Sequence, residues 1–195
     1  MGVLKLNSHY VTGIAGALGA GKSFVAKKLC EQTKGALIQV DDIRRDFLYR
    51  NESKFAKDFR QKLHHFLNLN PSNTQFFIDS TQLNSIVFKN EKNLQNFGQF
   101  CFPYFNQEID RQIKSCNCYQ IYLEWAYLIE QGYLNSVDSV ILVNCSKITI
   151  DKRLTYDFHF TSRVSDMRRQ LEPSFESRLK TLSQQEKPFK IYDNN

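Results

Sequence analysis

The sequence predicts an α/β protein built on a parallel sheet, and three observations support that prediction. A glycine-rich segment, residues 16–23, stands between an apolar stretch and a pattern of helical spacing. A second apolar stretch, Ala36–Val40, follows that pattern. A strand, a loop, a helix and a second strand in this order open many parallel α/β sheets. With 195 residues, the chain is long enough for one domain with a substantial core.

Four elements are predicted before residue 70 from the spacing of the apolar residues. They are a buried strand over His9–Ala15, a helix from Lys22, a strand over Ala36–Val40 and an amphipathic helix over Ser53–Leu67. Asp41 and Asp42 come directly after the second strand. That strand is therefore expected to end in two carboxylates.

The same spacing predicts the elements of the second half. They are a helix over Glu91–Phe100, strands over Tyr119–Leu123 and Val137–Val143, a helix that carries Arg153, a helix from Phe175 and a short strand over Lys190–Tyr192. Pro103 is expected to break or restart the first of these helices, because proline cannot donate a backbone hydrogen bond. Ser146 can cap the helix that carries Arg153. Glu124 closes the third strand.

The composition is that of an ordinary soluble protein, with 42% hydrophobic and 24% charged residues. The sequence has no apolar run of about 18 residues. Residues 1–10 lack the apolar core of a secretory signal, and the five cysteines lack the spacing of a zinc site, so a cytoplasmic protein with reduced thiols and no membrane contact is expected. The net charge of +6 fits a site for several phosphates. No basic stripe with interleaved aromatic residues points to nucleic acid.

Residues 16–23, with the sequence GALGAGKS, form a complete phosphate-binding loop. Its glycines let the backbone wrap closely around phosphate oxygens, with amide hydrogens pointing inward. Lys22 places a positive charge against the β- and γ-phosphates, and Ser23 offers its hydroxyl to Mg²⁺. The helix that follows directs its positive end at the anion. The expected nucleotide-binding residues are Gly19, Ala20, Gly21, Lys22, Ser23 and Phe24.

Phosphoryl transfer also needs a metal ion and a carboxylate near the attacking hydroxyl. Asp41 and Glu124 follow strands, and the ends of parallel strands converge on the crevice where ligands bind. Asp41 is therefore a candidate base, whereas Asp42 is interpreted as a solvated helix cap. Glu124 is either an acid of the metal shell, acting through water, or a structural residue, and the sequence leaves both interpretations open.

Arg153 and Arg163 flank a polar and aromatic stretch, residues 156–161, that is a candidate lid. Cations that close over the developing charge stabilise phosphoryl transfer. Most surface arginines only add solubility, so position alone does not assign a catalytic role to either residue.

Several segments resemble the dephospho-CoA kinase family. Residues 13–23, GIAGALGAGKS, follow that family's GLTGGIGSGKS loop, and residues 41–45, DDIRR, resemble the second half of its DADxIAR motif. Residues 78–88 are similar to its LDRxxLxxxVF segment, and residues 123–130 to its LDxPLLFE segment. Arg153 matches the arginine that begins the family's lid. The resemblance covers nearly the whole chain in order.

The resemblance implies a three-layer P-loop NTPase fold of the α/β class, with five parallel strands, a helical substrate-binding subdomain and a lid. Residues 1–195 would form a single kinase domain. Its core would span about residues 8–50 and 117–195, its helical CoA-binding insertion about 51–116, and its lid about 152–178.

By the same resemblance, the chain would transfer the γ-phosphoryl group of ATP to the 3′-hydroxyl of dephospho-CoA, with Mg²⁺, in the last step of coenzyme A biosynthesis. Asp41 would activate that hydroxyl, and Lys22 and Arg153 would stabilise the transferred charge. Ser23 and Glu124 are the expected metal residues. The expected partner is the small-molecule substrate, and the expected assembly is a monomer or a weak homo-oligomer.

The chain departs from the family pattern mainly at acceptor contacts and in the lid. The departures are Gln39 for the first Asp of DADxIAR, Ser80 for the Arg of LDR, Phe102 for the His before Pro103, Ala126 for the Pro of PLLFE and Asp157 for the second lid Arg, for which Arg163 is the candidate substitute. Two other interpretations stay open: a kinase for nucleosides or nucleotides, and a degenerate nucleotide-binding regulatory module. A GTPase is not expected, because the sequence has no NKxD motif.

Overall fold

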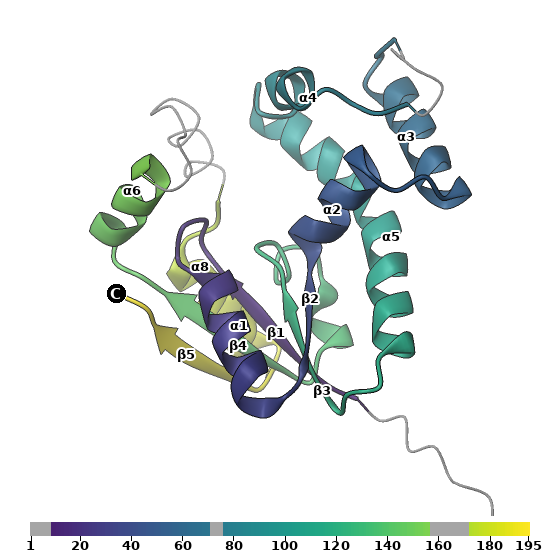
Figure 1. The fold of residues 1–195 in the computed structure, drawn as a ribbon. Helices are drawn as coiled ribbons and strands as arrows, with labels where there is room; N and C mark the ends of the chain where they lie inside the picture. Colours follow the sequence, from purple (N-terminus) through teal and green to yellow (C-terminus); the bar gives the residue numbers. More distant parts are fainter. Residues whose placement is uncertain (1–8, 71–75, 157–171) are drawn as a thin grey trace, which may run out of the picture. The chain divides into compact units, whose positions relative to one another are not determined.

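The computed structural model describes residues 9–70, 76–156 and 172–195 (Figure 1). The chain divides into two compact units, one formed by Met1–Gln39 with Arg111–Asn195 and the other by Val40–Asp110. The first unit contains the sheet and the phosphate loop, and the second is helical. Each unit has buried apolar side chains of its own.

Five parallel strands form the sheet of the first unit, in the order β2-β3-β1-β4-β5. They are β1 (Tyr10–Gly16), β2 (Ala36–Gln39), β3 (Gln120–Glu124), β4 (Ser139–Asn144) and β5 (Phe189–Asp193). The α/β class and the five-stranded parallel sheet are thereby confirmed. The predicted strands agree with the observed ones to within a few residues.

Helices flank this sheet on both faces, which gives three layers. The helices are α1 (Lys22–Thr33), α6 (Lys147–Tyr156), α8 (Phe175–Gln184) and the short 3-10 helix η1 (Tyr133–Ser136). In Figure 1, α1 and α8 lie on opposite sides of the strands. Beneath α1, a buried cluster joins the helix to the sheet through Ile14, Val25, Ala26, Tyr122 and Val143. Burial of apolar surface therefore fixes the helix that follows the phosphate loop.

Ser146 caps α6, as predicted. The Thr149 N–H donates to the Ser146 Oγ at 3.3 Å. This bond satisfies one of the backbone donors that the first helical turn leaves without an intrahelical partner. Ser146 thus helps to start the helix that carries Arg153.

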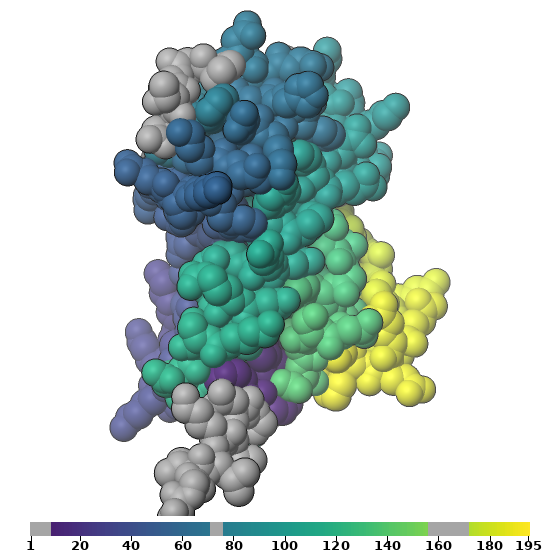
Figure 2. Space-filling view, turned by 90° about the vertical axis from the view of Figure 1, so that its right-hand side faces the viewer, coloured from purple at the N-terminus to yellow at the C-terminus, as the bar shows by residue number. Residues whose placement is uncertain are grey.

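The C-terminal segment is held to the sheet by backbone and side-chain bonds. The Val140 N–H donates to the Pro188 carbonyl oxygen at 2.9 Å, and Lys187 donates from its Nζ to the Val137 carbonyl oxygen at 2.8 Å. Figure 2 shows this segment in yellow, packed against the green residues that precede β4. The last strand therefore lies at a defined edge of the sheet, beside β4.

The second unit contains α2 (Val40–Tyr49), α3 (Lys54–Phe66), α4 (Ser80–Val87) and most of α5 (Glu91–Ser115). The predicted amphipathic helix over Ser53–Leu67 is confirmed as α3. Ser53 caps α3, because its Oγ accepts from the Ala56 N–H at 3.2 Å.

Two predictions about helix boundaries are wrong. The second strand ends at Gln39 and a helix begins at Val40, so Asp41 and Asp42 lie in the first helical turn rather than at a strand end. Acidic residues are favourable there because they face the positive end of the helix dipole. Pro103 lies inside α5 and neither breaks nor restarts it.

Aromatic side chains form the core of the second unit. The Phe59 ring is fully buried and lies 5.5 Å from the ring of Phe47, 6.1 Å from that of Phe105 and 5.0 Å from that of Tyr104. The neighbouring Arg60 is also fully buried, and its Nη1 donates to the carbonyl oxygen of Phe47 at 2.6 Å. Burial lowers the pKa of the Arg60 guanidinium from its ordinary value.

Replacing Phe59 with alanine is expected to lower the free energy of unfolding by about 3–5 kcal/mol, because the substitution removes a buried ring and leaves a cavity. Urea denaturation followed by circular dichroism measures this loss. Ile148→Ala is the control, because the Ile148 side chain is 70% exposed and its removal is expected to cost less than about 0.5 kcal/mol. Equal midpoints for the two variants would contradict this view of the core.

The described residues bear on two kinds of feature: membrane-spanning helices and clusters of metal-binding side chains. There, no helix is both long and apolar enough to cross a membrane. No group of three or more His, Cys, Asp or Glu side chains in these ranges could hold a metal ion. The five cysteines are free thiols, and burial raises the pKa of the Cys101 thiol above its ordinary value.

Candidate active site

The phosphate loop joins β1 to α1. Lys22 is the first residue of α1, so the loop lies against the end of the helix where backbone N–H groups lack intrahelical partners. The Lys22 side chain is buried, and its Nζ donates to the Ala17 carbonyl oxygen at 2.9 Å. The loop therefore combines oriented amide donors with a buried positive charge.

Gly21 takes a conformation that other residues adopt only with strain. Its φ is +87°, in the left-handed region, where it caps α1. A Cβ at this position would also overlap the Nδ2 of Asn194. The close approach of Asn194 to the loop thus depends on the absence of a side chain at residue 21.

A carboxylate and two polar side chains meet beside the loop. Glu124, at the end of β3, is buried, and its Oε2 accepts from the Ser23 Oγ at 3.2 Å and from the Gln39 Nε2 at 2.9 Å. Gln39 and Glu124 are register partners on the neighbouring strands β2 and β3. The sheet therefore brings both side chains to Ser23. Ser23 follows Lys22 in the first turn of α1.

These side chains fit a Mg²⁺ site in their chemistry. Mg²⁺ prefers oxygen ligands and usually keeps several waters, with one or two carboxylates and the phosphates of a substrate around it. Ser23 provides a hydroxyl oxygen and Glu124 a carboxylate, and the two are already in contact. An ion at Ser23 would have Glu124 within reach of its waters.

Gln39→Leu is expected to raise the Mg²⁺ concentration needed for half-maximal binding of a fluorescent ATP analogue by about 10-fold. Leucine keeps the approximate shape but removes the amide that orients Glu124, and residues that orient metal-shell groups often have effects of this size. A Mg²⁺ titration measures the change. The control is Gln120→Leu, at the other end of β3, where the side chain donates to the Thr12 Oγ1. An unchanged Mg²⁺ dependence in the Gln39 variant would exclude this role.

Arg153 contacts the loop from α6. Its Nη1 donates to the Gly19 carbonyl oxygen at 3.2 Å, and its Nη2 donates to the Asn194 carbonyl oxygen at 3.3 Å. The guanidinium is half-buried. A predicted site residue 131 positions beyond Lys22 in the sequence thus lies at the phosphate loop.

Asn194, which the sequence did not predict as a site residue, also contacts the loop. Its Nδ2 donates to the Ala20 carbonyl oxygen at 2.9 Å, and its backbone N–H donates to the Asn144 carbonyl oxygen at 2.9 Å. Asn194 follows β5 directly. The rule that ligand sites lie at the carboxyl ends of parallel strands could have identified it.

Asp41 belongs to the second unit, whereas Lys22, Ser23, Glu124 and Arg153 belong to the first. The Asp41 side chain is 70% exposed, and its Oδ1 accepts from the Arg44 Nε at 3.3 Å. An ion pair this exposed is weak, so the carboxylate can exchange Arg44 for another partner.

The remaining expected site residues differ in exposure. Ala20 is buried, whereas Phe24 is 61% exposed, so its expected role rests on its backbone N–H at the start of α1. Asp157, Arg163 and the middle of the expected lid lie outside the described residues.

Comparison with known proteins identifies a family. The model of the dephospho-CoA kinase family matches residues 10–180 of the chain. A search of the curated proteins finds no match.

Many solved structures are similar to the chain, and three of them illustrate the likeness. The protein TT1252 from Thermus thermophilus has a TM-score of 0.72 at 16% identity, over 96% of this chain and 89% of that one. Dephospho-CoA kinase from Campylobacter jejuni has a TM-score of 0.54 at 18% identity, over 96% of this chain and 89% of that one. Shikimate kinase from Acinetobacter baumannii, solved with shikimate, has a TM-score of 0.52 at 12% identity, over 97% of this chain and 86% of that one. At these identities the structures show a shared fold.

Proposed function

Because the chain belongs to the dephospho-CoA kinase family, we propose that it transfers the γ-phosphoryl group of ATP to the 3′-hydroxyl of dephospho-CoA. The match over residues 10–180, which includes both the phosphate loop and Arg153, carries this proposal. It is supported by the P-loop kinase fold and by the oxygen-rich contact between Ser23 and Glu124.

The loop would bind the nucleotide through its amides and Lys22. The Lys22 Nζ donates to the Ala17 carbonyl oxygen at 2.9 Å, which holds the ammonium on the loop. An ammonium has three N–H donors, so Lys22 can donate to the charged phosphate oxygens of ATP while it keeps the bond that positions it on the loop. Arg153, already bonded to Gly19, would add a second positive charge near the transferred group.

Ser23 and Glu124 would hold Mg²⁺, the serine directly and the carboxylate through water. When bound, the ion neutralises charge on the β- and γ-phosphates. Gln39 would keep Glu124 turned toward Ser23, because its amide donates to the same carboxylate oxygen that Ser23 contacts.

Asp41 would accept the proton of the 3′-hydroxyl. As the bond between the 3′-oxygen and the γ-phosphorus forms, the bond from that phosphorus to the β–γ bridging oxygen breaks, and ADP leaves. A carboxylate within hydrogen-bond reach of the hydroxyl lowers the barrier to this step. The exposure of Asp41 leaves its carboxylate accessible to an acceptor.

A kinase for a different small alcohol, such as a nucleoside or nucleotide, is the second candidate. Two acceptor-site departures favour it. Phe102 replaces the family's imidazole with a ring that lies 6.4 Å from the ring of Phe105, and Ser80 is an exposed first residue of α4 where the family has an arginine. Phe102 has no ring nitrogen and Ser80 has no positive charge, so neither side chain can replace the imidazole or the guanidinium of the family pattern.

A coupled assay of ADP release separates the two candidates. The protein is given ATP and Mg²⁺ with dephospho-CoA, and in parallel with a panel of nucleosides and nucleotides. ADP release that depends on dephospho-CoA supports the proposed reaction. Release with a nucleoside but not with dephospho-CoA would make the acceptor wrong while leaving the kinase reaction in place.

A further inference from the structure

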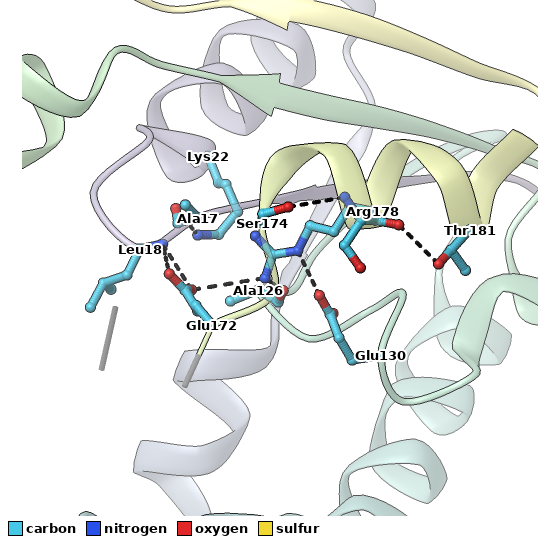
Figure 3. A network of polar contacts seen from close by, with 10 residues as sticks. Ala17, Leu18, Lys22, Ala126, Glu130, Glu172, Ser174, Arg178 and Thr181 are labelled. Atoms are coloured by element: carbon cyan, nitrogen blue, oxygen red, sulfur yellow. Dashed lines mark hydrogen bonds and ion pairs between the residues drawn. The ribbon is translucent and has the colours of Figure 1, made fainter. Parts of the chain in front are cut away.

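One peptide group of the phosphate loop is held by opposite charges on its two sides. The carbonyl oxygen of Ala17 accepts from the Lys22 Nζ at 2.9 Å. The N–H of Leu18 belongs to the same peptide group and donates to both carboxylate oxygens of Glu172, at 2.9 and 3.1 Å. Figure 3 shows Glu172 and Lys22 meeting this peptide group. The peptide between residues 17 and 18 therefore links an ammonium to a carboxylate.

Glu172 is itself held in place. Its side chain is only 9% exposed, and its Oε1 lies 3.9 Å from the Nη2 of Arg178, in the first unit like the loop. Arg178 is 2% exposed and donates from its Nε to the Glu130 Oε1 at 2.6 Å and from its Nη2 to the Ala126 carbonyl oxygen at 3.3 Å. These contacts fix the arginine on α8. The carboxylate on the loop thus rests on a buried and hydrogen-bonded cation.

This arrangement strengthens the hold on Lys22. A hydrogen bond with one ionised partner is shorter and stronger than a neutral one. When the N–H of a peptide group donates to a carboxylate, its carbonyl oxygen becomes more negative, and a chain of such bonds is mutually reinforcing. Loss of Glu172 would leave the Leu18 N–H without this acceptor and weaken the bond to Lys22.

We propose that Glu172 is a positioning residue for Lys22, acting through the Ala17–Leu18 peptide group. It fixes the tip of the loop, so that the ammonium is already beside the phosphate site when the nucleotide arrives. Preorganisation of this kind lowers the cost of binding. The inference rests on the proposed function, because it takes the loop as the site of the nucleotide phosphates.

Two variants test this role against a matched control. Glu172→Ala removes the acceptor and the charge, whereas Glu172→Gln keeps one acceptor oxygen. Glu176→Ala removes the same charge from an exposed position four residues later, in the first turn of α8. Calorimetry with a non-hydrolysable ATP analogue and Mg²⁺ measures affinity, amide exchange by NMR reports on the Leu18 N–H, and the thermal unfolding midpoint shows that each variant is folded.

The expected result is a dissociation constant about 10-fold higher for Glu172→Ala, about 3-fold higher for Glu172→Gln and unchanged for Glu176→Ala. Exchange of the Leu18 N–H is expected to be at least about 10-fold faster in the alanine variant than in the wild type. Wild-type affinity in a folded Glu172→Ala protein would overturn the proposal. Tighter binding would overturn it too, because the carboxylate would then be a competitor for the loop. If the wild type binds no ATP analogue, the proposed function fails instead.

Discussion

Replacing Lys22 with alanine is expected to lower kcat/KM for ATP by about 10³-fold or more, which abolishes turnover in practice. The Lys22 ammonium is a buried charge in the phosphate loop, 2.9 Å from the Ala17 carbonyl oxygen. Charge that develops on the transferred phosphoryl group in a buried site is stabilised most by cations already in position. Alanine leaves the loop's amide donors intact and removes only this charge. The measurement is the steady-state rate of ADP release with saturating acceptor.

The control is Lys27→Ala, which removes the same charge from an exposed position on α1. This variant is expected to turn over at the wild-type rate. A Lys22→Ala protein that stays within about 10-fold of the wild type would show that the loop is not the site of phosphoryl transfer.

Replacing Asp41 with asparagine is expected to lower kcat by about 10²-fold or more and to leave the affinity for ATP unchanged. Asparagine has nearly the same shape as aspartate but cannot accept the proton of the attacking hydroxyl. The substitution also removes the exposed ion pair between Asp41 and Arg44. This loss is expected to lower the free energy of unfolding only slightly, because such pairs contribute at most about 1 kcal/mol. Steady-state kinetics give kcat, and calorimetry with an ATP analogue gives the affinity.

Asp42→Asn is a closely matched control for this substitution. Asp42 lies in the same helical turn, is 58% exposed and forms an ion pair with Arg45 that parallels the pair between Asp41 and Arg44. Its replacement is expected to leave kcat unchanged. Equal kcat values for the two asparagine variants would remove Asp41 from the mechanism.

The sheet of this protein was predictable from local sequence. The short apolar runs along β1, β3 and β4 are buried, as the pattern of a parallel strand requires. The glycine-rich loop needs positive φ values, which Gly19 and Gly21 adopt. These features depend on residues close together in the chain, so the sequence contains their signals.

The helix boundaries near Val40 and Pro103 were not predictable in this way. The buried face of α5 runs through the proline, from Gly98 and Cys101 to Phe105 and Ile109. This face repeats every three or four residues, and its burial outweighs the backbone hydrogen bond that Pro103 cannot form. Tertiary packing therefore decided whether the helix continued.

The site was predictable in part. The loop residues were expected from their motif. Glu124 was left with two interpretations from the sequence. The contact of its Oε2 with Ser23 supports the interpretation as a residue of the metal shell. The roles of Gln39 and Glu172 could not be predicted, because each depends on a contact between residues far apart in the sequence. Gln39 contacts a residue 85 positions away, and Glu172 contacts one 154 positions away. No spacing rule relates a glutamate near residue 170 to a peptide group in the loop.

The central claim, that the acceptor is the 3′-hydroxyl of dephospho-CoA, is tested most directly by identifying the product. The protein is incubated with ATP, Mg²⁺ and dephospho-CoA, and the product is analysed by mass spectrometry and ³¹P NMR, with 3′-deoxy-dephospho-CoA as the control acceptor. The proposed function predicts CoA carrying one added phosphate at the 3′ position, and no product from the deoxy compound. Phosphorylation at another position, or ADP release without a phosphorylated acceptor, would contradict it.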